Sequence, residues 1–589
     1  MLKLFRNISK RNWGLVLLCV GLIVVQVWLE LTIPDYMSNI TQALQMQGST
    51  MSDILRPGGK MLLCALGSLA AAMTVAVCVS RVASDFAAAL RLRLFEKVQS
   101  FSMEEIGGFS TASLITRSTN DVTQIQTVVV MGLQVLVKAP VTAAWAIAKI
   151  ADKNWQWTLS TAVAVAVLLV IVLLALLIVL PKFKRLQRLT DDLNRVTRED
   201  LTGLRVVRAY NAEGYQERKF AQANDTLTNT QLFTTRSMSL LMPSISLVMN
   251  GLSLAIYWIG AIMIENTAGL MEKAVLFSDM VVFSSYAMQV VMSFMMLVVI
   301  FILLPRATVS AKRILEVLET PLRIRDGSRT EGTETGTVEF RDVSFRYPNA
   351  EDEALRHISF TAKKGETVAF IGATGSGKST LVNLIPRFYD ATEGTVLVDG
   401  ADVRAYRQKE LRDRIGYVSQ KAVLFSGTVG SNVSYGDNGR PAPTQADIRA
   451  AVETAQAADF VENMSKGYDG YIAQSGSNLS GGQKQRLSIA RAVARKPEIL
   501  IFDDSFSALD YKTDRAVRKA LAETCAGTTR LIVAQRIGTI RDADKIVVLD
   551  EGEMAGIGTH DELMRTCEVY RQIALSQLSK EELESCPDQ

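Results

Sequence analysis

The sequence contains no pair of cysteines at CxxC spacing and little net charge. Its six cysteines are scattered along the chain: Cys19, Cys64, Cys78, Cys525, Cys567 and Cys586. This spacing indicates neither a structural zinc site nor a disulfide framework, and it is typical of free thiols in a reducing compartment. The formal net charge is only +4 over 589 residues, so no nucleic-acid partner is expected.

Charged residues are also scarce in long runs of the first half of the chain, although they make up 21% of the whole. The second half has no such runs, and the mean hydropathy is +0.18. A chain of 589 residues is too long for one ordinary core. This asymmetry predicts a membrane domain over residues 1–318, followed by a soluble domain.

Six apolar runs are long enough to span a bilayer, which takes about 20 residues each. They cover residues 13–33, 61–80, 128–150, 159–180, 240–264 and 280–304. No small-residue cleavage site follows the first run. We therefore expect an uncleaved first membrane helix rather than a signal peptide.

Lysine and arginine predict the orientation of these spans. Basic residues precede the first span and fill two long links, 81–125 and 181–236, whereas the other links carry fewer. By the positive-inside rule, both chain ends face the cytoplasm. Each long link has helical periodicity and a polar bend, within 106–121 and 197–216, where a soluble domain can dock.

Two features of the spans are candidates for lining a substrate cavity. Lys138 is the one cation deep in a predicted span. Such a residue binds an anionic ligand, pairs with a carboxylate or extends to the interface, and a structural role is favoured here. The sixth span carries Met288, Met292, Met295 and Met296. Methionine surfaces adapt to varied hydrophobic ligands, although ordinary packing is the commoner role of such a stripe.

The soluble half begins after a polar stretch without periodicity, residues 319–335, which is predicted to be a linker. The sequence "TVEFRDVSFRYP", residues 337–348, alternates as a pair of strands does. The soluble domain is expected over 336–578, and an acidic tail over 579–589.

A phosphate-binding loop is predicted by "GATGSGKST", which fits GxxxxGK[ST] between a strand and a helix. Glycines let backbone N–H groups curl around phosphate at the helix N-terminus. Lys378 supplies charge to the β- and γ-phosphates, and Ser379 offers its hydroxyl to Mg²⁺. The nucleotide-binding residues expected here are Gly372, Thr374, Gly375, Ser376, Gly377, Lys378, Ser379 and Thr380.

Two later motifs extend this prediction. "ILIFD" reads as a buried strand that delivers Asp503 to Mg²⁺ through water. "LSGGQKQR" places a second glycine turn at a helix start, formed by Leu479, Ser480, Gly481, Gly482 and Gln483. One nucleotide cannot use two distant glycine turns of one domain. The economical solution is two chains, each of which offers this turn to the other's nucleotide.

In this order, the motifs resemble those of an ATP-binding cassette (ABC) transporter half-molecule of the exporter type, over nearly the whole chain. The resemblance implies an all-α membrane domain of six helices with long cytoplasmic extensions. An α/β P-loop cassette with a helical signature subdomain follows it. It also implies that Tyr347 stacks on adenine, that Gln420 in "GYVSQ" senses Mg²⁺ and meets the membrane domain, and that Asp510 ends "SALD". The two polar bends resemble the family's coupling helices.

Two positions depart from the family pattern. Asp504 stands where a catalytic glutamate is usual, and its carboxylate is set back by about 1.5 Å, one C–C bond. Gln535 stands where a histidine usually contacts the γ-phosphate, and the two histidines of the chain, His357 and His560, lie elsewhere. These substitutions predict a site that binds ATP and hydrolyses it slowly.

The leading hypothesis is therefore the degenerate-site subunit of a heterodimeric multidrug exporter in a bacterial inner membrane. It would use ATP and Mg²⁺, and a second ABC half-transporter chain would be its partner. Amphipathic drugs are the leading substrates, ahead of lipids and peptides. A homodimeric exporter and an ATP-gated regulatory or channel-like module are the alternatives.

Overall fold

The computed structural model describes residues 2–5, 10–45, 50–151, 153–348 and 350–577, so the predicted acidic tail lies outside the described residues. The chain forms two compact units. One comprises residues 1–99 and 111–319, and the other comprises residues 100–110 and 320–589.

The first unit is entirely helical. Its elements are α1 (Leu2–Phe5), α2 (Lys10–Gln45), α3 (Met51–Gln99), α5 (Thr111–Thr116), a π-helical turn (Arg117–Asp121), α6 (Val122–Ala151), α7 (Trp155–Ala209), α8 (Glu213–Ser239), α9 (Leu241–Glu265) and α10 (Leu270–Glu319). Among the described residues, six helical stretches are long and apolar enough to cross a membrane. This confirms a polytopic helical domain.

Three helices, α3, α7 and α10, are much longer than the apolar runs within them, with 49, 55 and 50 residues. At about 1.5 Å per residue, the 55 residues of α7 reach roughly 80 Å, against a hydrocarbon core of about 30 Å. Pro181 lies inside α7 and does not end it, although the apolar run stops there. A proline inside a membrane helix can kink the helix without ending it, because neighbouring groups satisfy the carbonyl that loses its hydrogen bond.

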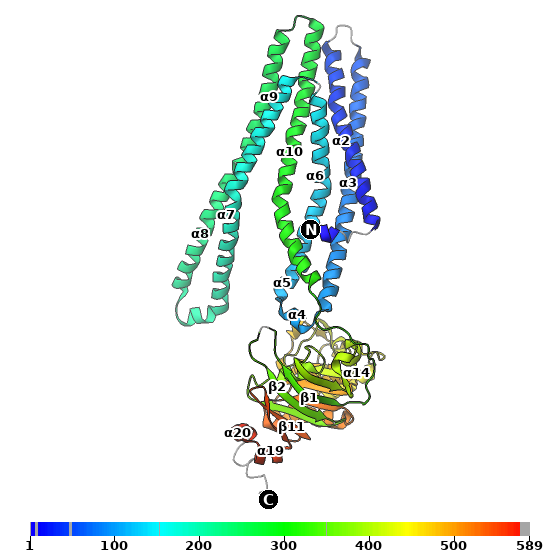
Figure 1. Ribbon diagram of the computed structural model, residues 1–589, viewed down its shortest axis with the longest axis vertical. Helices are drawn as coiled ribbons and strands as arrows, with labels where there is room; N and C mark the ends of the chain where they lie inside the picture. The colour runs from blue at the N-terminus through cyan, green and yellow to red at the C-terminus, as the bar shows by residue number, and fades with distance from the viewer. Residues whose placement is uncertain (1, 6–9, 46–49, 152, 349, 578–589) are drawn as a thin grey trace. The chain divides into compact units, whose positions relative to one another are not determined.

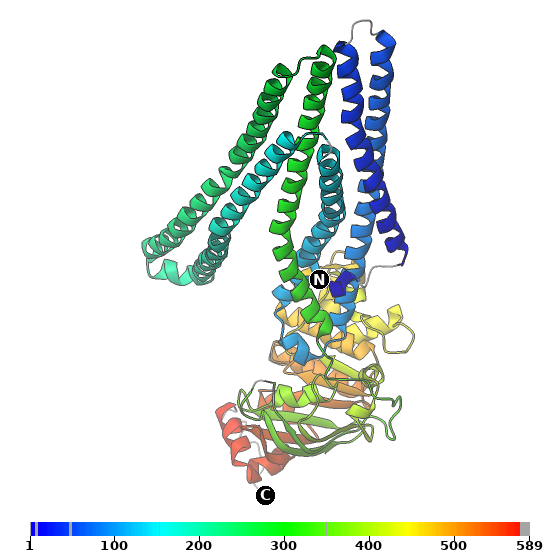
Figure 2. The same ribbon diagram turned by 45° about the horizontal axis from the view of Figure 1, so that its top comes forward.

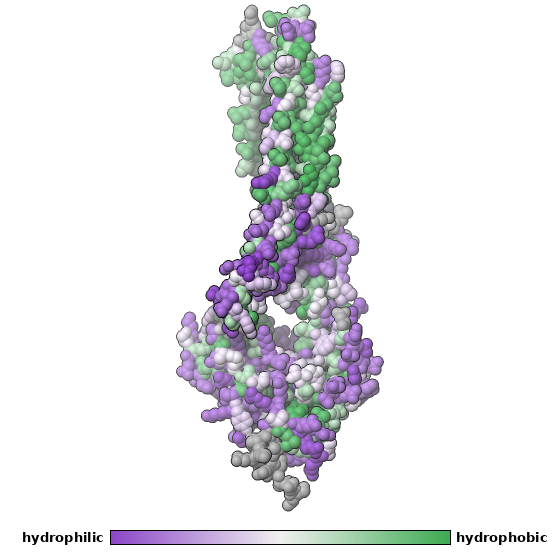
Figure 3. Space-filling view, turned by 90° about the vertical axis from the view of Figure 1, so that its left-hand side faces the viewer, coloured by the Kyte–Doolittle hydropathy of each residue, from purple (hydrophilic) through white to green (hydrophobic). Residues whose placement is uncertain are grey.

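The helical unit has a packed group and a separate hairpin. Trp157, Phe283 and Tyr286 are fully buried in its core, which also draws on α2, α3, α6 and α9. By contrast, α8 lies beside α7, and both helices run away from α2, α3 and α6 (Figures 1 and 2). Hydrophobic residues predominate on the upper part of this unit in Figure 3, and hydrophilic residues predominate on the lower part, where α7 and α8 join. This is the expected surface of a helix that enters lipid at one end only.

The second unit is an α/β domain with two main sheets. The mixed sheet has the order β12-β11-β3-β10-β9-β6, in which β12 (Glu553–Gly558) alone is antiparallel to its neighbour. The parallel strands are β6 (Ile415–Val418), β9 (Ile499–Asp503), β10 (Thr529–Val533), β3 (Thr367–Gly372) and β11 (Lys545–Asp550). In such sheets, ligands bind at the carboxyl ends of the strands.

An antiparallel sheet in the order β2-β1-β4-β5 completes the core. Its strands are β1 (Val338–Phe345), β2 (Leu355–Ala362), β4 (Glu393–Val398) and β5 (Ala401–Asp402). The segment "TVEFRDVSFRYP" therefore contributes one strand, β1, and not a pair. Its partners lie downstream in the sequence, which explains why local alternation did not reveal them.

Helices cover the rest of this unit. They include α11 (Lys378–Leu384), α12 (Gln408–Asp413), α13 (Val429–Val433), α14 (Gln445–Thr454), α15 (Ala458–Glu462), α16 (Gly481–Ala494), α17 (Tyr511–Thr524), α18 (Ile537–Ile540), α19 (His560–Thr566) and α20 (Glu568–Gln577). A short ladder of β7 (Gly427–Thr428) and β8 (Tyr471–Ile472) lies among them.

The stretch 319–335 is held against this unit. Gly327 N–H donates to the Tyr406 carbonyl at 2.9 Å, and Thr333 N–H donates to the Asp399 carbonyl at 2.8 Å. A Cβ at Gly327 would lie 2.0 Å from the Ala405 carbonyl oxygen, so only glycine allows this approach. Composition without periodicity predicted a linker here, and backbone pairing of this kind leaves no periodic signal.

The short helix α4 (Met103–Gly107), which overlaps only the start of the first predicted bend, belongs to the second unit. Its capping residue Ser102 forms a capping box with Glu105, whose other carboxylate oxygen accepts the Arg323 N–H at 2.8 Å. Glu104 and Arg323 form an ion pair. The bend in the second long link is the turn between α7 and α8, at residues 210–212.

Candidate functional site

The phosphate-binding loop joins β3 to α11, as the sequence predicts. Gly377 caps α11 with a left-handed φ of 92°, a conformation that favours glycine. The Lys378 ammonium donates to the carbonyls of Gly372 at 2.9 Å and Ala373 at 2.6 Å, and to the Ser376 hydroxyl at 3.2 Å. Burial lowers the pKa of Lys378, and the carboxylates of Asp504 and Asp503 oppose this shift. The lysine thus donates to oxygens of its own loop, which the oxygens of a bound phosphate would replace.

Asp503 ends the buried strand β9 and lies directly against this loop. Its Oδ1 accepts the Ser379 hydroxyl at 2.6 Å, and the Tyr417 hydroxyl lies 3.3 Å from its Oδ2. Tyr417 also donates to Asn383 Oδ1 at 2.9 Å. Burial raises the pKa of Asp503, and the hydrogen bonds from Ser379 and Tyr417 oppose that rise.

Tyr417 and Asn383 were not among the residues predicted from the sequence. Tyr417 lies three positions before Gln420 in the quoted "GYVSQ", on β6 beside β9. Strand adjacency is the signal that could have found it.

Asp504 is the centre of a second hydrogen-bonded group. Its side-chain Oδ2 accepts the Gln535 amide at 2.7 Å and the Gln420 amide at 3.2 Å. Asp504 is 6% exposed, whereas both glutamines are exposed. These three residues follow β9, β10 and β6, three neighbouring parallel strands, so the sheet brings them together. Asp504 and Gln535, the two residues that depart from the family pattern, therefore contact each other directly.

Tyr347 lies near the start of α11. Its hydroxyl is 2.9 Å from the Thr380 hydroxyl, and its ring meets Phe345 and Tyr389 edge-on, at centroid distances of 4.8 and 5.4 Å. An aromatic ring held by two others at its edges keeps a fixed orientation, as a surface for base stacking requires.

The glycine turn of "LSGGQKQR" starts α16. Ser480 is the N-cap, and its hydroxyl accepts the Gln483 N–H at 3.3 Å while its own N–H donates to Gln483 Oε1 at 2.9 Å. Ser480 and Gly481 are exposed, and Leu479 and Gly482 are partly exposed. Among the described residues, no hydrogen bond joins this turn to Lys378, Asp503 or Asp504. Asp510 is separate too, because it caps α17 through Thr513 N–H at 3.0 Å.

The phosphate-loop group fits ATP and a magnesium ion by the chemistry of its donors. Lys378 and a helix N-terminus supply positive potential to phosphate. The Ser379 hydroxyl, the Gln420 amide oxygen and the Asp503 carboxylate are the hard oxygen ligands that Mg²⁺ prefers. Ser379 and Asp503 already lie 2.6 Å apart, within the reach of one ion.

In the helical unit, Lys138 pairs with a carboxylate. Its ammonium lies 2.9 Å from Glu30 Oε1, which also accepts the Gln26 amide at 2.8 Å and the Ser68 hydroxyl at 3.2 Å. The two charged side chains are 27% and 30% exposed. Of the three roles considered for Lys138, the structure shows pairing with a carboxylate, that of Glu30.

The four methionines divide between two environments. Met292 and Met296 are 49% and 43% exposed on α10 of the single chain. Met288 and Met295 are partly buried, and Met295 packs against the core of the helical unit. Their role as a substrate surface stays a prediction.

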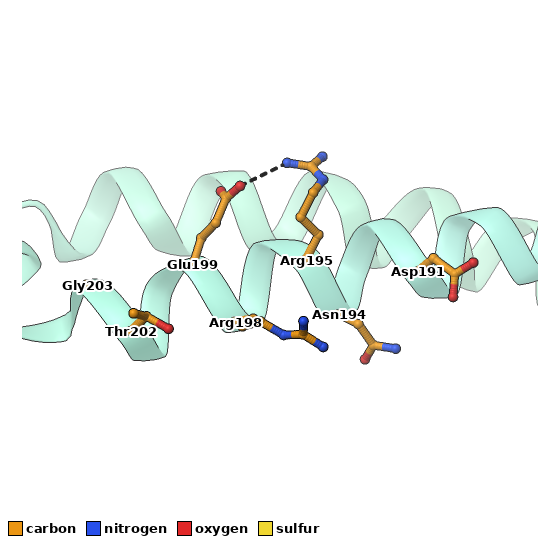
Figure 4. Close-up of a pocket in the computed structure, with 7 residues that line it drawn as sticks. All are labelled: Asp191, Asn194, Arg195, Arg198, Glu199, Thr202 and Gly203. Atoms are coloured by element: carbon orange, nitrogen blue, oxygen red, sulfur yellow. Dashed lines mark hydrogen bonds and ion pairs between the residues drawn. The ribbon is translucent and has the colours of Figure 1, made fainter. Parts of the chain in front are cut away.

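A hollow of about 680 Å³ lies along α7 of the helical unit, and most of the residues that line it are polar or charged (Figure 4). All seven lining residues come from this one helix: Asp191, Asn194, Arg195, Arg198, Glu199, Thr202 and Gly203. Arg195 and Glu199 form an ion pair at 3.2 Å within it. A hollow lined by one exposed helix and by side chains that pair with each other is a surface feature of that helix.

Comparison with known proteins gives a consistent result over the whole chain. Residues 355–507 match the ABC transporter family, and residues 16–294 match the ABC transporter transmembrane region. An uncharacterized ABC transporter ATP-binding protein of Mycobacterium tuberculosis is 39% identical over 98% of this chain and 98% of the relative. The uncharacterized YfiB of Bacillus subtilis is 37% identical over 88% and 89%.

Two further similarities concern a named activity and a solved structure. An ATP-dependent lipid A-core flippase of Pseudomonas putida is 33% identical over 81% of this chain and 77% of the relative. The structure of a bacterial Atm1-family ABC exporter with ATP bound matches with a TM-score of 0.79 at 24% identity. That match covers 97% of this chain and 100% of the other. At this identity the structural match supports the fold alone.

Proposed function

Because the chain belongs to the ABC transporter family, we propose that it is the half of an ATP-driven exporter whose own nucleotide site binds ATP but hydrolyses it slowly. The family consists of transport ATPases that work as dimers in a membrane, and ATP binding by the cassette follows from membership. The observation that supports slow hydrolysis is the Asp504 carboxylate, which two glutamine amides hold.

Hydrolysis requires a base within hydrogen-bond reach of the attacking water. Asp504 is one methylene shorter than glutamate, and its Oδ2 is already occupied by Gln535 and Gln420. The neutral Gln535 amide also cannot carry the charge of a protonated imidazole. The remaining residues suit binding: Lys378 and the loop N–H groups hold phosphate, and Ser379, Gln420 and Asp503 would hold Mg²⁺. When bound, that ion offsets the phosphate charge.

The intact glycine turn supports a partner chain. Ser480 and Gly481 are exposed at the start of α16 and bond to none of the groups at this chain's own site among the described residues. We propose that they complete the nucleotide site of a second ABC half-transporter, which carries the glutamate and the histidine missing here. The assembly would then have two unequal sites.

The proposal extends to the substrate and to the cellular location of the chain. Exposed Met292 and Met296 suit hydrophobic or amphipathic compounds, so drug-like molecules lead. The basic links support a cytoplasmic N-terminus and cassette, and we propose that the spans lie in the inner membrane of a bacterial cell. A lipid is the second candidate, because a relative at 33% identity is named a lipid A-core flippase.

The test compares ATP hydrolysis by the chain purified alone with hydrolysis by the chain co-purified with its partner. Alone, the chain should turn over ATP slowly. The double variant Asp504→Glu/Gln535→His should raise that rate by roughly a hundredfold, which is the usual contribution of a positioned base. Co-purification should also recover a second ABC half-transporter.

Asp504→Asn is the matched control, since it keeps the size of the side chain and removes its charge. It should leave the slow rate of the single chain nearly unchanged. Brisk hydrolysis by the unpaired wild-type chain would rule out a degenerate site and favour a homodimer. Nucleotide binding without substrate movement in vesicles would instead favour an ATP-gated module.

A further inference from the structure

The last residue of α20 contacts the loop that carries Gln535. Gln577 Nε2 donates to the Gln535 carbonyl at 2.8 Å, and Gln577 Oε1 accepts the Ile537 N–H at 2.9 Å. One side-chain amide therefore bonds to the backbone on both sides of Arg536. The two bonds use the donor and the acceptor of the amide together, which fixes its orientation.

The helix that presents Gln577 is itself firmly placed. Tyr570 and Ala574 of α20 are fully buried in the core of the second unit. The Tyr570 hydroxyl lies 2.7 Å from His560 Nδ1, which joins α20 to the start of α19. The amide of Gln577 thus reaches the loop from a helix that two buried side chains anchor in the core.

The loop needs an outside partner at this point. Ile537 begins α18, a helix of four residues, and its N-cap Arg536 makes no side-chain capping bond. The first N–H groups of a helix have no partner within the helix. Gln577 Oε1 supplies the acceptor that a capping side chain usually provides.

The side chain of Gln535, on the same loop, points toward the predicted nucleotide site. The Gln535 amide donates to Asp504 Oδ2 at 2.7 Å, so the bonded series runs from Gln577 through the loop backbone to Asp504. We propose that Gln577 is a positioning residue, which clamps residues 535–537 from the C-terminal helix and thereby keeps the Gln535 amide on Asp504. Only its consequence for ATP rests on the proposed function, because the clamp itself stands on the hydrogen bonds.

The first test measures hydrogen exchange of the Ile537 amide in the full chain without nucleotide. Gln577→Met keeps the length of the side chain and removes both bonds, so exchange should become about tenfold faster, the equivalent of one ordinary hydrogen bond. Gln572→Met is the matched control on the same helix, since Gln572 bonds only to Glu568 among the described residues. It should leave the rate unchanged.

Gln577→Glu separates the two bonds and guards against a misfolded methionine variant. A carboxylate still accepts the Ile537 N–H but cannot donate to the Gln535 carbonyl. Ile537 should therefore stay protected in this variant. Equal exchange of Ile537 in the wild type and in Gln577→Met would overturn the clamp, whatever the hydrolysis rate of the chain.

The second test asks whether the clamp acts through Gln535. ATP should dissociate several-fold faster from Gln577→Met and from Gln535→Met, and the double variant should be no worse than the worse single one. Additive losses would show that Gln577 affects the site by another route. A chain that hydrolyses ATP briskly would refute the degenerate site but leave the hydrogen-exchange readout of the clamp intact.

Discussion

At the residue scale, the backbone of Asp504 explains part of its identity. Asp504 has a left-handed φ of 47°, and its N–H donates to the Val533 carbonyl at 3.1 Å. Aspartate and asparagine tolerate this conformation better than most residues other than glycine. Aspartate therefore suits the turn after β9 better than glutamate does, at the cost of carboxylate reach.

His560 gives a pH-dependent prediction at the same scale. It is 5% exposed, and burial, with a smaller contribution from Arg541, lowers its pKa. Asp561 and Asp542 oppose the shift. The folded chain therefore binds this proton less readily than the unfolded chain. The stability that His560 contributes is full above the unfolded pKa of about 6.5 and is lost as the pH falls toward the lower folded value.

We expect the apparent unfolding temperature of the second unit to decrease as the pH is lowered from 7.5 to 5.5. One proton accounts for at most about 1.4 kcal/mol per pH unit. His560→Asn retains an acceptor near Tyr570 but does not titrate, so its midpoint should depend less on pH. Scanning calorimetry of the full chain measures both. An identical pH dependence in the variant would assign the effect to other groups.

At the element scale, two glycines of the phosphate-binding loop offer a matched comparison. Gly375 and Gly377 have nearly equal φ values of 89° and 92°. A Cβ at Gly375 would meet nothing within 4 Å, whereas a Cβ at Gly377 would lie 2.7 Å from the Ala354 carbonyl oxygen. Both positions therefore demand a left-handed backbone, and only Gly377 adds a steric collision.

Gly375→Ala should destabilise the second unit by roughly 1–2 kcal/mol, the cost of a left-handed alanine. Gly377→Ala should cost more, because the Ala354 backbone must move as well. Thermal unfolding without nucleotide measures both variants and keeps any collision with phosphate out of the comparison. Equal losses in the two variants would show that the loop relaxes away from Ala354.

The elements of the site were largely predictable from the sequence, and their long-range partners were not. Lys378, Asp503 and Gln535 follow β-strands within short motifs, and parallel pairing places the ends of those strands together. Lys138 shows the limit. Its partner Glu30 lies 108 residues away, on another helix, so local pattern left three roles open.

The clamp shows the same limit in the second unit. Gln577 lies 42 residues beyond Gln535, and an exposed glutamine at a helix end has no distinctive sequence signal. The stretch 319–335 was predicted as a linker, and its hydrogen bonds to the second unit were not predicted, because they come from backbone groups, which composition does not reveal. Tertiary pairing thus decided the details that periodicity and motif spacing left undetermined.

At the scale of the whole molecule, the proposed asymmetry assigns different tasks to two parts of one chain. In the proposed assembly, the group around Asp504 would hold this chain's own nucleotide, and the turn at Ser480 and Gly481 would serve the partner's nucleotide. Gly481 suits a test of the second task, because a Cβ there would meet nothing within 4 Å and a substitution should leave the fold intact.

We expect Gly481→Glu to reduce ATP hydrolysis by the assembled pair at least about tenfold, because a carboxylate beside the partner's phosphates opposes their charge. Asp504→Asn in the same chain should change the rate of the pair by less than about twofold, since the fast site is not its own. Steady-state hydrolysis by the co-purified pair measures both, and the unfolding midpoint of each variant checks that it folds. In a symmetric assembly, both substitutions would fall on working sites, and Asp504→Asn would then be as damaging as Gly481→Glu. Similar losses in the two variants would therefore exclude unequal sites, whereas the expected difference has no explanation in a pair of equivalent ones.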